Sequence, residues 1–299
     1  MKIGIAATFG DSPYRDIEFL KSYAAGIEET GFNSLWAPEH VVFFPKYDSK
    51  YPYKADGKVP WKAEGKDRGV LYDPLLVLSV AACVTSRLRL GTTVLVVPER
   101  PALLAAKEIM TLDHISGGRF EFGAGLGWSA EEYAALGVTW ERRGKRFDEY
   151  LEAMKVAWTE EFASYHGEFV NFDNVVLEPK PVTPGGPPIL IGGNSKAALR
   201  RAAKLGDGWY GVWYGMEPLD PVLDDLHHHL EEAGRKPGEG FKVKVNVPMS
   251  ADVTPEEVAW KIKESPRLGI DELVLGVPIR SKHLEKDIRF WADLVGVSG

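Results

Sequence analysis

Residues Gly117-Gly-Arg-Phe-Glu-Phe-Gly-Ala-Gly-Leu-Gly-Trp128 join a helix stop, a strand and a glycine-rich turn. The glycine pair at the start ends the preceding helical sequence. Apolar residues then alternate with polar or small ones over Phe120–Ala124, which predicts one face of a buried strand. The main chain lacks side chains where this strand ends, at Gly123, Gly125 and Gly127. We expect either an ordinary turn or a place where a flat ligand approaches the backbone.

The same succession of strand and helix recurs on both sides of this stretch. Short apolar strands are predicted at 2–7, 34–37, 88–97, 120–125, 188–191, 208–213, 241–247 and 271–277. Helical sequence follows each strand, as in 16–30, where apolar residues recur at helical spacing and Gly31 ends the pattern. Eight strands that alternate with helices predict the α/β class and a (β/α)₈ TIM barrel.

Two irregular segments interrupt the alternation, and we expect them to be insertions in a single domain that spans residues 1–299. The first covers about 41–72, after strand 2, and is rich in tyrosine, lysine and proline. Its aromatic residues, Tyr47, Tyr51, Tyr53 and Trp61, favour an ordered loop with a function. The second covers about 164–184, before strand 5, and alternation over 167–172 predicts a small hairpin.

Composition excludes several classes of protein. The chain has 299 residues, 44% of them hydrophobic, and a net charge of −7, which argues against a nucleic-acid surface. No apolar run approaches the ~18 residues that span a bilayer. Met1–Ala6 reads directly into a strand, so we expect no signal peptide and a cytoplasmic protein. Cys83 is the only cysteine, and its apolar helical surroundings predict a buried, unreactive thiol.

In a barrel of this kind the active site lies at the carboxyl ends of the strands. His40 follows strand 2 and is the candidate for proton chemistry, since imidazole titrates near neutral pH. The alternative is a histidine that only bonds the loop behind it. Glu39 is expected either to orient or charge the imidazole or to face solvent. Other strand ends offer Thr92, Thr93, Val94, Trp128, Trp209, Trp213 and Arg280.

The end of the fifth predicted strand, 188–191, has the pattern of an anion-binding site. Gly192, Gly193, Asn194 and Ser195 precede a helix, whose first amides would point at a phosphate, and the two polar side chains could add bonds. An ordinary capped turn is the alternative. No metal site is predicted, because the residues of His227–His229 point in different directions on a helix. These features favour a flat, phosphate-bearing redox cofactor that carries the difficult chemistry.

Four segments in order resemble the bacterial luciferase-like monooxygenase superfamily: 34–40 (SLWAPEH), 90–96 (LGTTVLV), 111–128 (TLDHISGGRFEFGAGLGW) and 187–193 (PPILIGG). More narrowly, they are similar to its actinobacterial branch of coenzyme F420-dependent oxidoreductases. The long tyrosine-rich segment after His40 is also similar to that branch. The resemblance spans nearly the whole chain.

The resemblance implies a cofactor ring held over a bulge in strand 3, where a cis peptide would fall at Thr93-Val94. It implies a catalytic role for His40 near the reacting carbon. The positions that would contact the ring, ribityl chain or phosphate are Gly125, Gly127, Trp128, Gly192, Gly193, Asn194 and Ser195.

The expected function is hydride transfer between coenzyme F420 and a small organic substrate. Sugar-phosphate dehydrogenases of the superfamily carry an acid in the turn after strand 4, where this chain has Gly125-Leu-Gly-Trp128; its nearest acids are Glu131 and Glu132. An apolar or aromatic substrate is therefore favoured. The alternative is a two-component monooxygenase that uses reduced FMN from a separate reductase, and a third reading is a barrel that only binds a flavin. By resemblance we expect a homodimer.

Overall fold

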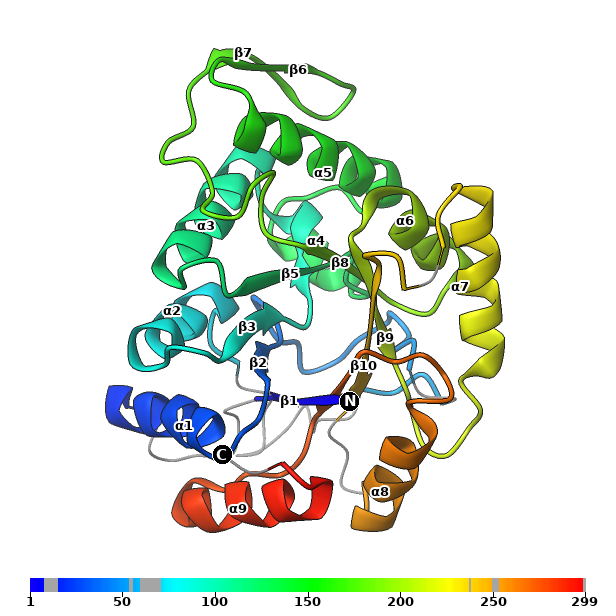
Figure 1. The fold of residues 1–299 in the computed structure, drawn as a ribbon. Helices are drawn as coiled ribbons and strands as arrows, with labels where there is room; N and C mark the ends of the chain where they lie inside the picture. Colours follow the sequence, from blue (N-terminus) through cyan, green and yellow to red (C-terminus); the bar gives the residue numbers. More distant parts are fainter. Residues whose placement is uncertain (8–15, 54–55, 60–70, 237, 249–252, 298–299) are drawn as a thin grey trace.

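The computed structural model describes residues 1–7, 16–53, 56–59, 71–236, 238–248 and 253–297. It is a closed parallel β-barrel surrounded by helices, as predicted (Figure 1). The chain pairs its barrel strands in the order β3-β2-β1-β11-β10-β9-β8-β5-β4, and β3 also pairs with β5 to close the ring. The strands are β1 (Lys2–Ala6), β2 (Ser34–Ala37), β3 (Arg89–Thr92), β4 (Leu95–Val96), β5 (Phe120–Gly125), β8 (Ile189–Gly192), β9 (Gly208–Val212), β10 (Lys242–Val247) and β11 (Glu272–Leu275).

Helices follow the strands and cover the outside of the barrel (Figure 1). Polar side chains cap several of their starts; for example, Asp16 accepts from the amide of Phe19 at 2.9 Å, and Thr254 accepts from that of Glu257 at 3.2 Å. The helices are α1 (Ile17–Glu29), α2 (Pro74–Val84), α3 (Ala102–Ile115), α4 (Ala130–Ala135), α5 (Arg143–Thr159), α6 (Lys196–Leu205), α7 (Asp220–Glu232), α8 (Pro255–Glu264) and α9 (Leu284–Val295), with 3₁₀ turns at η1 (Val97–Glu99) and η2 (Ser281–His283).

The third barrel strand is not continuous as predicted over 88–97 but is divided into β3 and β4. Leu90 stands opposite Phe120, whereas Leu95 stands opposite Ala124. Residues 91–94 therefore face residues 121–123 of β5, which are one fewer. The extra residue makes a β-bulge, and the Thr93-Val94 peptide within it is cis, as the resemblance predicted.

The inside of the barrel is filled in layers. The middle layer is apolar and holds Ala6, Trp36, Val94, Leu190, Tyr210 and Val274. Below it, towards the amino ends of the strands, the Lys244 ammonium pairs with the buried carboxylates of Glu121 and Glu272. Glu272 also accepts from the Ser34 hydroxyl at 2.5 Å, so this charged layer is hydrogen-bonded on several sides.

The two insertions leave the barrel at different strands: the first follows β2, and the second precedes β8. The second contains the predicted hairpin, formed by β6 (Ala163–His166) and β7 (Asn171–Val175), which pair as a separate antiparallel sheet. Figure 1 shows this hairpin beside α5, on the outside of the molecule. The first insertion lies near α4, to which it is tied by hydrogen bonds described below. Part of it, including Trp61, lies outside the described residues.

Cys83 is exposed on α2, so the predicted burial of its thiol is wrong; an apolar run on a helix has an outer face as well as an inner one, and Cys83 lies on the outer face. Within the described parts of the chain, no helix has the length and apolar character needed to cross a membrane.

Candidate active site at the carboxyl ends of the strands

His40 lies just beyond the end of β2, as predicted, and its imidazole is fixed by a carboxylate from another part of the chain. The Nδ1 atom is 2.8 Å from Oε2 of Glu132 on α4, and the two side chains are 13% and 3% exposed. The other oxygen of Glu132 accepts from the amides of Val41 at 2.6 Å and Val42 at 3.3 Å. One buried carboxylate therefore holds both the imidazole and the backbone that follows it.

Glu132 was not predicted as a site residue. In the sequence it completes the pattern Ser129-x-x-Glu132, which is typical of a capping box. Ser129 does cap α4, accepting from the amide of Glu132 at 3.1 Å. The carboxylate, however, reaches the imidazole and the loop instead. Only spatial proximity to His40, 92 positions away, identifies it.

Glu39 neither bonds the imidazole nor faces solvent, so the predictions that it orients His40 or is exposed are wrong. It is buried and receives the Arg100 guanidinium on both oxygens, at 2.6 and 3.1 Å. Its Oε2 also accepts from the amide of Val96 at 2.5 Å. Because neighbouring residues of an extended chain point to opposite sides, His40 and Glu39 diverge, and Glu39 joins the end of β2 to β4. A catalytic role for it stays a prediction.

Glycines at and just after the end of β5 make room for the bulge. A Cβ at Gly125 would lie 2.3 Å from Cγ2 of Val94, and one at Gly127 would lie 2.9 Å from Cγ1 of Val96. Gly192 at the end of β8 is similar, since its Cβ would lie 2.7 Å from Cγ1 of Val94. At these glycines the space that a side chain would fill is taken by valine side chains of the bulge and of β4, and the predicted contact of a ligand with the backbone stays a prediction. Gly125 and Gly192 let strand ends close around the Val94 side chain, and Gly127 leaves room for Val96.

The turn after β8 is capped, and part of its predicted phosphate-binding chemistry is already used. Ser195 accepts from the amide of Ala198 at 3.3 Å and so begins α6. The amide side chain of Asn194 bonds both main-chain groups of Val212, at 2.6 and 3.0 Å. Gly193 has φ +109°, a backbone conformation that side chains rarely adopt. Phosphate binding here stays a prediction that rests on main-chain amides and Ser195.

An aromatic cluster stands beside His40. Trp128 lies 5.7 Å from the imidazole, 5.0 Å from Tyr47 and 5.3 Å from Tyr51 between ring centroids. Tyr53 stacks on Tyr214 at 6.1 Å. We call residues 41–53 the aromatic loop.

The two tryptophans predicted at other strand ends belong to the core. Trp209 and Trp213 are 0% and 2% exposed. Their ring nitrogens donate to the main-chain oxygens of Gly193 and Glu217, both at 2.8 Å. The side chain of Trp209 points out of the barrel, because Tyr210 next to it points in.

A half-buried acid, Glu99, lies behind the glycine turn. The Oε1 atom of Glu99 is 3.8 Å from where a Cβ of Gly127 would stand. Its Oε2 is buried and has no hydrogen-bond partner among the residues that the structure describes. Burial, together with the nearby carboxylates of Glu132 and Glu39, raises the pKa of Glu99 to about 9. The side chain is therefore protonated at neutral pH.

Two further predicted groups are occupied by local partners. Arg280, after β11, binds Asp287 through Nε at 2.7 Å and Nη2 at 2.6 Å. In the histidine triplet on α7, His229 and His228 both contact Glu232, at 2.8 and 3.4 Å. Across the described ranges, no three His, Cys, Asp or Glu side chains are grouped as metal ligands would be.

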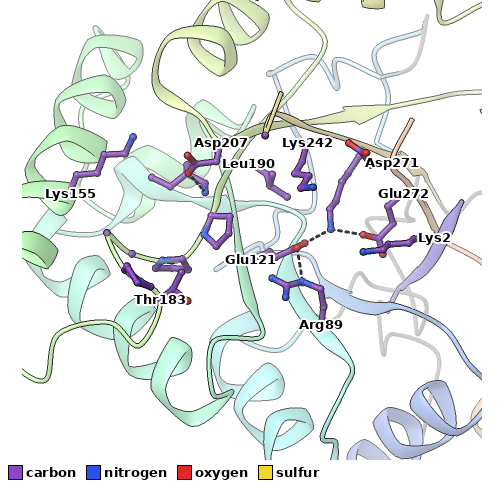
Figure 2. A pocket seen from close by; sticks show the side chains of 18 residues that line it. Lys2, Arg89, Glu121, Lys155, Thr183, Leu190, Asp207, Lys242, Asp271 and Glu272 are labelled. Atoms are coloured by element: carbon purple, nitrogen blue, oxygen red, sulfur yellow. Dashed lines mark hydrogen bonds and ion pairs between the residues drawn. The ribbon is translucent and has the colours of Figure 1, made fainter. Parts of the chain in front are cut away.

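A cavity of about 690 Å³ lies at the other end of the barrel (Figure 2). Its lining includes Lys2, Arg89, Lys242 and Glu272, which begin their strands, and the charged layer forms its inner wall. Burial alone would raise the pKa of Glu121, but the charges of Lys244 and Arg89 hold this pKa below its usual value. At the amino ends of barrel strands such groups usually serve stability.

Comparisons with known proteins agree with this architecture. Residues 1–285 match the model of the family described as luciferase-like monooxygenase. An uncharacterized protein of Mycobacterium tuberculosis is 34% identical over 254 residues, 85% of either chain. The FMNH(2)-dependent dimethylsulfone monooxygenase of Pseudomonas putida is 32% identical over 183 residues, 60% of this chain and 49% of that protein.

Among solved structures, the coenzyme F420-dependent tetrahydromethanopterin reductase of Methanopyrus kandleri superposes with a TM-score of 0.75. The two chains are 17% identical, and the superposition covers 97% of each, so the likeness concerns the fold. The family match extends over most of the sequence and includes the strand ends described above. The chain belongs to the luciferase-like monooxygenase family.

Proposed function

We propose that the chain is a coenzyme F420-dependent oxidoreductase that acts on a small apolar or aromatic substrate. The observation that carries this proposal is His40, held by Glu132 at the end of β2 and placed 5.7 Å from Trp128 of the glycine turn. When bound, F420 gives or takes a hydride at the C5 atom of its deazaflavin. His40 takes or returns the proton that accompanies that hydride, so the substrate gains or loses both together.

The residues proposed to hold the cofactor surround the bulge. Thr93 and Val94 would support the ring, with Gly125, Gly127 and Trp128 beside it. The turn Gly192–Ser195 would offer main-chain amides and the Ser195 hydroxyl to the phosphate, at the start of α6.

Two unsatisfied polar atoms in the barrel fit a ligand with a polar ring edge. The Tyr210 side chain is 1% exposed, and its hydroxyl has no partner of hydrogen-bond geometry in the described chain, although Thr93 lies near it. Oδ1 of Asn246 is also buried without a described partner. Asn246 is two residues beyond Lys244 on β10, so it points to the same side, into the barrel. Buried polar atoms are rarely left unpaired, which supports a ligand or water here.

The surroundings favour an apolar or aromatic substrate. Trp128, Tyr47, Tyr51 and His40 present ring faces and edges to one another at 5.0–5.7 Å. Aromatic walls bind flat apolar groups through burial and ring stacking. The turn after β5 has Trp128 where sugar-phosphate dehydrogenases of the superfamily carry an acid, and Glu131 and Glu132 are both occupied by the aromatic loop.

A second candidate is a monooxygenase that receives reduced FMN from a separate reductase. The 32% identity over 183 residues to an FMNH(2)-dependent enzyme favours it. Both cofactors carry a tricyclic ring and a phosphate, so the features of the site fit either.

Separate titrations of the purified protein with F420 and with FMN test the proposal. We expect saturable binding of F420, followed by oxidation of reduced F420 with a panel of aromatic ketones and quinones. Tight FMN binding without F420 binding would refute the proposal and support the second candidate. His40→Ala serves as the matched variant: turnover should fall by on the order of 10²–10⁴-fold, while F420 affinity stays within about threefold.

A further inference from the structure

The hydrogen bonds around Glu132 determine which nitrogen of His40 carries a proton. An ionised carboxylate is only an acceptor. Its Oε1 atom accepts from the amides of Val41 and Val42, and its Oε2 atom is 2.8 Å from Nδ1 of His40. At that distance the imidazole must donate from Nδ1. In neutral histidine the lone pair is then on Nε2, the nitrogen that can take a proton.

The same helical turn holds the aromatic loop at a second place. Glu131, next to Glu132 on α4, accepts from the amides of Asp48 at 2.6 Å and Ser49 at 2.9 Å. Burial alone would raise the pKa of Glu131, but these hydrogen bonds from amides lower it to about 2. Two neighbouring carboxylates thus bind two parts of one loop, and only Glu132 also touches His40.

We propose that Glu132 is a positioning residue that fixes His40 in the tautomer with the proton on Nδ1 and links this tautomer to the seating of the aromatic loop. The inference deepens the proposed function and rests on it only for the role of His40 in proton transfer. When residues 41 and 42 leave the carboxylate, Glu132 loses the bonds that aim its second oxygen at Nδ1. A disordered loop would therefore also release the imidazole.

Replacement of Glu132 by glutamine makes a sharp test, because the loop amides determine how the new side chain is oriented. Val41 and Val42 are donors, so they hold the oxygen of the glutamine amide and direct its nitrogen towards His40. That nitrogen donates, and Nδ1 must then accept. The neutral imidazole changes to the tautomer with its proton on Nε2, where it cannot take a proton from the substrate.

The matched control is Glu131→Gln. It replaces the adjacent carboxylate of the same turn, weakens the hold on Asp48 and Ser49, and leaves the contact with His40 in place. A role in ordering the loop alone would affect both variants similarly. A role in setting the tautomer would affect Glu132→Gln only.

The primary measurement is nitrogen NMR of the full chain labelled with ¹⁵N-histidine, without any ligand, between pH 6 and 9. The His40 signals are assigned by their loss in His40→Ala. We expect neutral His40 to be protonated on Nδ1 in the native protein and in Glu131→Gln, and on Nε2 in Glu132→Gln. A native protein with the proton on Nε2, or no change in Glu132→Gln, would overturn the inference.

The second measurement uses F420 titrations and the best acceptor of the substrate panel. We expect Glu132→Gln to lower kcat by on the order of 10²–10⁴-fold, as carboxylate-to-amide changes behind a catalytic histidine do. KM and F420 affinity should change by less than about threefold, which is below 1 kcal/mol. Equal losses of kcat in the two variants would show that Glu132 acts only by ordering the aromatic loop, and would contradict the inference. Failure of F420 to bind would refute the proposed function but leave the NMR result standing.

Discussion

Glu99→Gln should make the protein more stable, and more so as the pH rises. The folded protein keeps Glu99 protonated up to a pKa of about 9, whereas the unfolded chain releases the proton near 4.5. The folded state therefore binds the proton more tightly, and stability falls between these two pH values. Each unit of pKa difference corresponds to about 1.4 kcal/mol, so the cost at pH 7 is at most about 3 kcal/mol.

Glutamine has nearly the same shape as the protonated acid but no proton to lose. Urea denaturation of both proteins at pH 5, 7 and 8.5 gives the difference in unfolding free energy. We expect a difference below about 1 kcal/mol at pH 5 and a gain of roughly 1–3 kcal/mol at pH 7, larger again at pH 8.5. Glu141→Gln, on the exposed surface, controls for the loss of one carboxylate. A difference that does not change with pH, or one that falls, would refute the argument.

Three further substitutions test the surroundings of the bulge. Gly125→Ala places a Cβ 2.3 Å from Val94, so we expect a loss of about 1–3 kcal/mol in urea unfolding, and a loss below about 0.5 kcal/mol would mean that the bulge adapts. Tyr210→Phe removes a buried hydroxyl without a described partner, so stability of the ligand-free protein should stay equal or rise by up to about 1 kcal/mol; a clear loss would reveal a partner. Gly193→Val imposes a side chain where φ is +109° and should weaken cofactor binding at least tenfold, or about 1.4 kcal/mol, with the fold checked by melting; native affinity would place the phosphate elsewhere.

Periodicity was sufficient to predict the barrel, because each strand and each helix has its own local signal. The short run 208–213 and the longer pattern of 16–30 both became the predicted elements, as β9 and α1. The division of the third strand had no such signal. Val94 and Leu95 are good strand residues, and only the resemblance indicated a bulge between β3 and β4.

The site was less predictable, since its decisive contacts join distant residues. His40 could be found from its place at a strand end, but Glu132 is one of two adjacent acids with the same helical context. Which acid reaches the imidazole depends on how α4 lies against the aromatic loop. The contacts of Glu39 were unpredictable for the related reason that its partner, Arg100, lies 61 positions away. The residue types indicated that these side chains could do chemistry, but only the tertiary contacts show which acid binds the imidazole and which binds Arg100.

The extra residue of the bulge has a consequence for the length of the chain. An uninterrupted ladder from Leu90 to Leu95 against β5 needs one residue fewer than the protein has. Deleting a single residue at position 93 would let both ends of the strand keep their present partners. The barrel strand would then pair with β5 without a break, and the bulge that carries Val94 would be lost. Such a shortened protein would separate what the strand contributes to assembly from what it contributes to chemistry.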